Sequence, residues 1–118
     1  MIFSVADHIK QIVSGDKTQT RRDSPKYQTG HTYAIQPGRG KPGDKRGCII
    51  ITHMWIEKAH NEKGEKNFIH PLDAEVEGGY TSEEYEVLYE RLHPLWETRY
   101  AYEFKFIPFG SLESKEMG

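Results

Sequence analysis

Residues 15–22 read GDKTQTRR, which places Thr20 three residues after Lys17 and two before Arg22. A threonine hydroxyl becomes a nucleophile when a nearby base takes its proton. Lys17 can be that base if burial or neighbouring positive charge lowers its pKa from about 10.4 toward roughly 7 to 8. Arg21 and Arg22 supply such charge. This segment therefore has the residue types for nucleophilic chemistry at Thr20.

The expected backbone of the same segment opposes that chemistry. Residues 17–22 alternate and include two threonines, which favours a strand. Side chains alternate between the two faces of a strand, so Lys17 and Thr20 would point in opposite directions. Spacing alone favours an exposed basic strand end. Only an irregular start after Gly15 would bring the two side chains together.

A helix is expected just before this segment, over residues 3–13. Ser4 is a suitable N-cap, and Gly15 suits a left-handed exit. The apolar residues recur at helical spacing: Val5, Ile9, Ile12 and Val13. The segment 15–22 therefore lies at a junction between a helix and a strand.

Further strands are predicted over 31–36, 48–60 and 99–107. The last has Tyr and Phe on one face, and Arg99, Glu103 and Lys105 on the other. The turn at 61–64 predicts that residues 55–60 and 65–70 pair as a hairpin.

Two helical segments are expected between these strands. A short helical turn follows Pro71 and stops at Gly78, and a longer helix begins at a capping box formed by Thr81 and Glu84. Its apolar stripe is Tyr85, Leu88, Tyr89 and Leu92. Strict alternation of strand and helix is absent, so the predicted class is α+β, a small curved sheet or barrel with two or three peripheral helices.

The chain totals limit the class of protein. A length of 118 residues predicts one domain, and 36% hydrophobic with 12% aromatic residues predicts a folded core. Cys48 is the only cysteine, so no internal disulfide forms. The longest apolar run is too short for a membrane helix and no secretory signal is visible, so we expect a cytoplasmic protein without a membrane partner.

Charge is distributed unevenly along the chain. Residues 10–46 hold nine basic and three acidic residues, whereas the rest holds seven basic and fifteen acidic ones. A basic segment on an acidic protein indicates a local anion site rather than whole-surface attraction to nucleic acid. Two complementary halves packed on each other explain the pattern equally well.

Other motifs carry weaker signals. Residues 38–43, GRGKPG, match a dinucleotide fingerprint, but Pro42 stands where a helix would open, so no nucleotide cofactor is expected. Arg39 and Lys41 in this loop could still contact phosphates, or the loop is merely solvated. The six histidines show no metal-binding spacing, and no metal or other cofactor is predicted. Trp55 and Trp96 are the aromatic residues expected at a pocket mouth.

The run Gly15, Lys17, Thr20, Arg22 matches G-x-K-x-x-T-x-R, which resembles the signature of the ASCH domain family. Three later features resemble bacterial and phage members of that family: an I-x-P-G-R-G loop at 35–40, a DA-x-x-EGGY segment at 73–80, and a closing F-x-F strand at 104–106. The resemblance covers nearly the whole chain. It implies one domain with a PUA-like β-barrel over residues 1–109. Residues 110–118 have little apolar surface to bury, so a frayed tail is expected there.

The resemblance also implies functions. ASCH domains are generally taken as related to RNA or nucleotides, and one bacterial branch removes the acetyl group from N(4)-acetylcytidine with a Lys, a Thr and a Glu. Carried over, Lys17 is the general base, Thr20 the nucleophile and Glu77 the carboxylate, with Glu75 as the fallback because EGGY departs from that branch. Arg22 would bind an anion or order the cleft.

Three hypotheses follow. The first is a basic cleft that binds RNA, a nucleotide or a modified nucleoside, with Arg21, Arg22, Arg39 and Lys41 as ligand contacts. The second is an amidohydrolase acting through Lys17, Thr20 and Glu77. In the second, a Glu77 carboxylate beside Lys17 would raise the pKa of that lysine, which opposes its use as a base. The third is a protein-interaction module without a nucleic-acid role.

Overall fold

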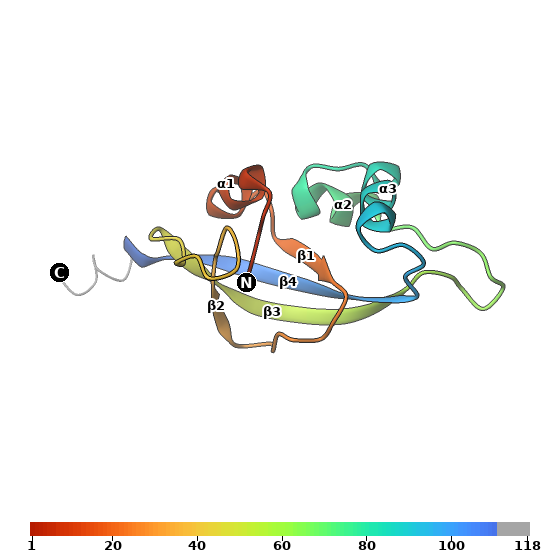
Figure 1. The fold of residues 1–118 in the computed structure, drawn as a ribbon, viewed down its shortest axis with the longest axis horizontal. Helices are drawn as coiled ribbons and strands as arrows, with labels where there is room; N and C mark the ends of the chain where they lie inside the picture. Colours follow the sequence, from red (N-terminus) through yellow and green to blue (C-terminus); the bar gives the residue numbers. More distant parts are fainter. Residues whose placement is uncertain (111–118) are drawn as a thin grey trace.

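The computed structural model describes residues 1–110 as three helices and four strands (Figure 1). In chain order the elements are α1 (Ala6–Ser14), β1 (Gln19–Arg22), β2 (Thr32–Ala34), β3 (Gly47–Lys58), α2 (Pro71–Gly78), α3 (Ser82–Leu92) and β4 (Thr98–Pro108). The predicted α+β class is confirmed. Of the tail predicted over 110–118, all but Gly110 lies outside the described residues.

The strands form one antiparallel sheet in the order β1-β4-β3-β2. The two long strands β3 and β4 pair along their whole length, with one irregularity between Ile51 and His53. β1 and β2 are the edges of this open sheet, so the closed barrel that the resemblance implied stays unconfirmed. The predicted hairpin of 55–60 with 65–70 is confirmed only next to its turn, where an antiparallel bridge joins His60 to Lys66 and Asn67 N donates to Ala59 O at 2.8 Å; residues 67–70 form no strand.

The three helices lie on one side of the sheet in Figure 1, with α1 apart from the pair α2 and α3. The predicted capping box is present at α3, where Thr81 and Glu84 bond each other's backbone N–H groups. The predicted Ser4 cap of α1 is wrong, since Val5 is the N-cap and no side chain caps it. Gly15 ends α1 in the left-handed conformation, at φ 90°, as predicted.

Two hydrophobic clusters hold the helices on the sheet. The first lies beneath α1 and includes Phe3, Ile12 and Tyr102; the second lies between α2 and α3 and includes Ala74, Tyr85 and Tyr89. Polar residues separate them. Apolar burial therefore fixes two halves of the helical layer independently and leaves a charged region between the halves.

Candidate functional site

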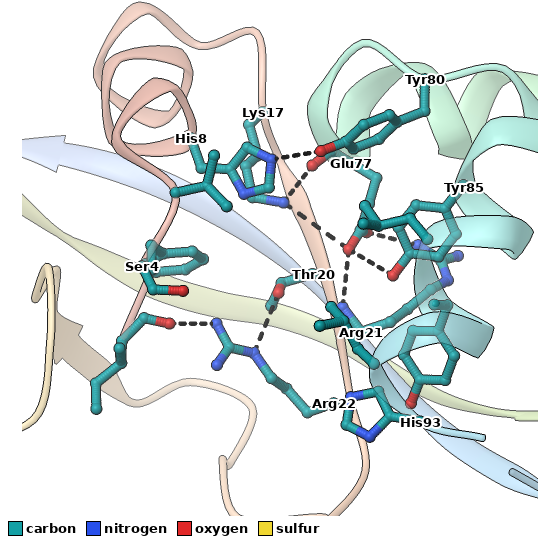
Figure 2. Close-up of a pocket in the computed structure, with 16 residues that line it drawn as sticks. Ser4, His8, Lys17, Thr20, Arg21, Arg22, Glu77, Tyr80, Tyr85 and His93 are labelled. Atoms are coloured by element: carbon teal, nitrogen blue, oxygen red, sulfur yellow. Dashed lines mark hydrogen bonds and ion pairs between the residues drawn. The ribbon is translucent and has the colours of Figure 1, made fainter.

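A pocket of about 250 Å³ lies between the two hydrophobic clusters (Figure 2). Phe3 of the first cluster and Tyr85 and Tyr89 of the second contribute to its walls. The charged side chains of the pocket are those singled out in the sequence: Lys17, Arg21, Arg22 and Glu77, with Thr20 among them. Helix α2 and the segment 15–22, which lie far apart in the chain, therefore build one site.

The glycine exit from α1 decides where Lys17 points. Between Gly15 and the strand the chain donates two backbone bonds, from Lys17 N to Gln11 O at 3.0 Å and from Thr18 N to Val76 O at 2.9 Å. Lys17 precedes β1, and its ammonium lies beside Glu77, which also pairs with Arg21 four residues further along. Both Lys17 and Thr20 line the pocket, but Lys17 donates to backbone carbonyls and Thr20 accepts from Arg22, so the direct contact that the chemistry requires is not formed between them.

Lys17 is buried, with 2% of its surface exposed. Its ammonium donates to the carbonyl oxygens of Gln19, at 2.7 Å, and of Glu77, and lies 3.8 Å from Glu77 Oε1. Burial lowers the pKa of Lys17 to about 8, although the charge of Glu77 raises it. The anticipated opposition between Lys17 and Glu77 is therefore present, and burial is the larger effect.

The hydroxyl oxygen of Thr20 accepts a hydrogen bond from Arg22, not from Lys17. Arg22 Nε donates to Thr20 Oγ1 at 3.2 Å, and its Nη2 donates to Ile2 O at 2.7 Å. The guanidinium stacks 5.0 Å from the ring of Phe3, and burial lowers its pKa. Among residues 1–110 no carboxylate forms an ion pair with Arg22, so its charge faces the pocket unbalanced.

Glu77 is held on three sides at the end of α2. Its Oε1 accepts from Arg21 N and from the Tyr85 hydroxyl, both at 3.0 Å, and its Oε2 accepts from Arg21 Nη1 at 2.9 Å. The carboxylate is therefore fixed beside Lys17. Glu75, the alternative position, is exposed on the same helix and does not line the pocket.

The four predicted ligand contacts do not lie together. Arg21 lines the pocket, but its side chain is fully buried and engages Glu57 and Glu77. Arg39 and Lys41 lie in the exposed loop between β2 and β3, where neither lines the pocket. Arg22 is thus the predicted contact with charge available to a ligand.

Several pocket residues were not predicted. His8 of α1 and Tyr80 meet across the pocket, with His8 Nε2 3.0 Å from the tyrosine hydroxyl. Burial, with the charge of Lys17, lowers the pKa of His8 to about 4. Tyr85 and Tyr89 appeared in the sequence only as core residues of the α3 stripe. Nothing in their spacing separates a hydroxyl at a pocket from one at a core edge, so only the structure reveals them.

Neither of the tryptophans predicted at a pocket mouth lines this pocket. Trp55 donates to Glu57 Oε2 at 2.9 Å, whereas Trp96 packs on Tyr89 and lines a separate pocket with His60, Lys66 and Glu90. Within residues 1–110, no cluster of three or more histidine, cysteine or acidic side chains is arranged to hold a metal ion. Within the same range, none of the three helices has the length and apolar character needed to cross a membrane.

The fold is similar to solved ASCH structures. A point mutant of ZmASCH from Zymomonas mobilis superposes with a TM-score of 0.58 at 18% identity, over 91% of this chain and 70% of that one. The ASCH domain from Lactobacillus crispatus gives 0.59 at 17%, over 90% and 77%. A protein from Enterococcus faecalis assigned to the family DUF984 gives 0.59 at 16%, over 91% and 79%.

The sequence comparisons add no further relative. No protein-family model matches the chain, and neither does any curated protein. The likeness, at these identities, is one of fold. The resemblance seen in the signature at residues 15–22 is thus confirmed in three dimensions, and the chain has the fold of the ASCH domain.

Proposed function

We propose that the pocket binds a nucleoside, a nucleotide or one exposed nucleotide of an RNA strand. The observation that carries this proposal is the unpaired guanidinium of Arg22. A partly buried cation is costly to desolvate unless an anion joins it. Arg22 has no carboxylate partner among the described residues, and a phosphate would supply one.

The rest of the pocket supports a ligand of that size and kind. A volume of about 250 Å³ is near the lower end for ligand pockets, which suits one nucleoside-sized group rather than several stacked bases. The Tyr89 hydroxyl, on the wall formed by the second hydrophobic cluster, is buried and has no hydrogen-bond partner within residues 1–110. A ligand atom would satisfy that hydroxyl.

Binding of cytidine 5′-monophosphate and of cytidine to the intact protein tests this proposal by calorimetry. Arg22→Gln should weaken binding of the monophosphate at least about tenfold and leave cytidine nearly unchanged, because only the former carries an anion. Charge reversal at Arg22 should also lower affinity for single-stranded RNA and its salt dependence. Lys105→Gln, at an exposed site on β4, is the matched control.

Equal affinity of the wild type and Arg22→Gln for the monophosphate would exclude Arg22 as the anion contact. If the wild type binds no nucleoside, nucleotide or RNA, the site has another use. The protein-interaction hypothesis would then stand.

A second candidate is hydrolysis of an amide such as N(4)-acetylcytidine. The observation that favours it is Lys17, whose pKa is lowered to about 8 in the pocket that also holds Thr20. Arg22 donates to Thr20 Oγ1, which favours the negative charge that develops on this oxygen during attack.

The reaction would proceed in two stages. Thr20 Oγ1 bonds to the amide carbon while its proton passes to neutral Lys17, and the C–N bond then breaks as Lys17 returns the proton to the leaving amine. Water next attacks the carbonyl carbon of the acyl-Thr20 ester while Lys17 takes its proton; the bond from that carbon to Oγ1 then breaks, Lys17 returns the proton to Thr20 Oγ1, and acetate leaves with release of the second proton to solvent. Thr20→Ala should abolish turnover while cytidine binding persists. Absence of turnover by the wild-type protein would remove this candidate.

A further inference from the structure

The fold carries a chain of ion pairs that extends from the pocket into the protein. It runs Glu86, Arg99, Glu57, Arg21, Glu77, and we call it the ionic chain. Only its last two members line the pocket. The other three have no part in the proposed binding or hydrolysis, and their burial calls for a separate explanation.

The sheet register brings the three central members together. Glu57 on β3 lies opposite Arg99 on β4, and Ala101, two residues further along β4, lies opposite Arg21 on β1. Positions two apart in a strand share a face, so these three side chains project from the same face of neighbouring strands. Glu86 of α3 and Glu77 of α2 complete the chain from the helical layer.

Glu57 links the two arginines of the ionic chain. Its Oε1 accepts from Arg21 Nε at 2.9 Å and from Arg99 Nε at 2.8 Å. Its Oε2 accepts from Arg21 Nη2 and from the indole of Trp55, both at 2.9 Å. Arg21 is therefore hydrogen-bonded to two carboxylates, Glu57 and Glu77, and forms a third, longer ion pair with Asp73 at 3.9 Å.

We propose that Glu57 is a positioning residue, which shares Arg21 with Glu77 and so leaves the Glu77 carboxylate able to face Lys17. Without Glu57, the full charge of Arg21 would act on Glu77, which is its nearest remaining carboxylate; Asp73 lies 3.9 Å away. The negative charge of Glu77 would then stabilise the positive charge of Lys17 less. The ionic chain therefore tunes the proton affinity of Lys17 from outside the pocket.

The other groups around Lys17 do not depend on Glu57. His8 faces it from α1 and is neutral near pH 7, since its pKa is about 4. Arg22 faces it from β1, and the Tyr85 hydroxyl from α3 donates to Glu77. Glu57 itself stays ionised: burial raises its pKa, but the bonds from Arg21, Trp55 and Arg99 lower it to about 2. A change at Glu57 therefore acts on Lys17 through Arg21 and Glu77.

The test is the titration of Lys17 in the unliganded full chain, followed by NMR of labelled lysine side chains and assigned with Lys17→Met. Glu57→Gln should lower the pKa of Lys17 by about half a unit or more. Asp44→Asn removes the same charge from an exposed pair with Arg46 and should leave Lys17 unchanged. A Lys17 titration that is unchanged or raised in Glu57→Gln would overturn the proposal.

A second variant keeps the test valid if Glu57→Gln does not fold. Glu57→Asp keeps the charge, but its shorter side chain cannot reach both guanidinium groups, so a smaller shift in the same direction is expected. An unchanged Lys17 in a folded Glu57→Asp protein would count equally against the proposal. Because no ligand is needed, these outcomes are independent of whether the pocket binds nucleotides.

Discussion

The ammonium of Lys17 lies 3.8 Å from a carboxylate oxygen of Glu77, which is sixty residues away in the chain. Lys17 reaches this place because the chain leaves α1 through Gly15, and Glu77 because α2 ends beside β1. This contact is where the two halves of the helical layer meet over the sheet. The chemistry available to the pocket depends on how firmly Lys17 holds its proton beside the Glu77 carboxylate.

The first prediction concerns stability against pH. The pKa of Lys17 is about 8 in the folded protein and 10.5 when unfolded, so below pH 8 both states bind the proton and the fold bears a buried charge. Between pH 8 and pH 10.5 only the unfolded chain keeps the proton of Lys17, so the free energy of unfolding rises with pH. Relative to Lys17→Met, the wild-type free energy of unfolding should rise by about 2 kcal/mol from about pH 7 to about pH 9.5.

Urea denaturation at the two pH values measures this difference. Lys10→Met, at an exposed lysine of α1, is the control and should run parallel to the wild type. If the free energy of unfolding of Lys17→Met also changes with pH as that of the wild type does, Lys17 has an ordinary pKa in the folded protein and the prediction is wrong.

The second prediction compares the two glutamates of α2. Glu77→Gln should lower the free energy of unfolding by about 3 kcal/mol, because Arg21 is left buried with one carboxylate fewer. Glu75→Gln, two residues earlier and exposed, should change it by less than about 0.5 kcal/mol. Similar losses for both, measured by chemical denaturation, would contradict the assignment of Glu77 as the buried partner.

The third prediction concerns two buried hydroxyls. Tyr89 Oη and Ser82 Oγ both lack a hydrogen-bond partner within residues 1–110, but only Tyr89 lines the pocket. Tyr89→Phe and Ser82→Ala should each keep or raise stability by up to about 1 kcal/mol, since no bond is lost. Only Tyr89→Phe should weaken binding of cytidine 5′-monophosphate, by about three- to tenfold. Equal affinity in both variants would remove Tyr89 from the ligand contacts.

The fourth prediction separates a mononucleotide site from an RNA surface. Arg39 and Lys41 lie outside the pocket, so the double variant with glutamine at both positions should bind cytidine 5′-monophosphate within about twofold of the wild type. If the loop contacts phosphates of a longer strand, the salt slope for single-stranded RNA should fall by about 0.7 per lost contact. A large loss of monophosphate affinity would mean that the loop reaches the pocket after all.

Much of the local structure follows from short-range patterns. The capping box at Thr81 and Glu84, the exit at Gly15 and a strand over residues 99–107 were all predicted and confirmed. These features depend on backbone bonds and side-chain alternation within a few residues. The signature at 15–22 likewise indicated the right fold family.

Pairing over longer distances was beyond such patterns. The turn at 61–64 predicted a local hairpin, which is formed only at the His60–Lys66 bridge, whereas β3 pairs along its whole length with β4, a strand forty residues further along the chain. Arg99 was expected on the polar face of its strand, yet it is buried because Glu57 and Glu86 reach it from β3 and α3. Neither partner is identifiable from spacing.

The sequence by itself determined which residues could act in the pocket: Lys17, Thr20, Arg22 and Glu77 are types that chemistry needs, at positions that a family signature marks. Only the tertiary structure decided the pKa values and the ion-pair partners of these residues. Burial lowers the pKa of Lys17, the sheet register brings Arg21 to Glu57, and Arg22 meets the Ile2 carbonyl and the Phe3 ring rather than a carboxylate. Charge and proton affinity depend on neighbours distant in the chain, and folding alone brings those neighbours together.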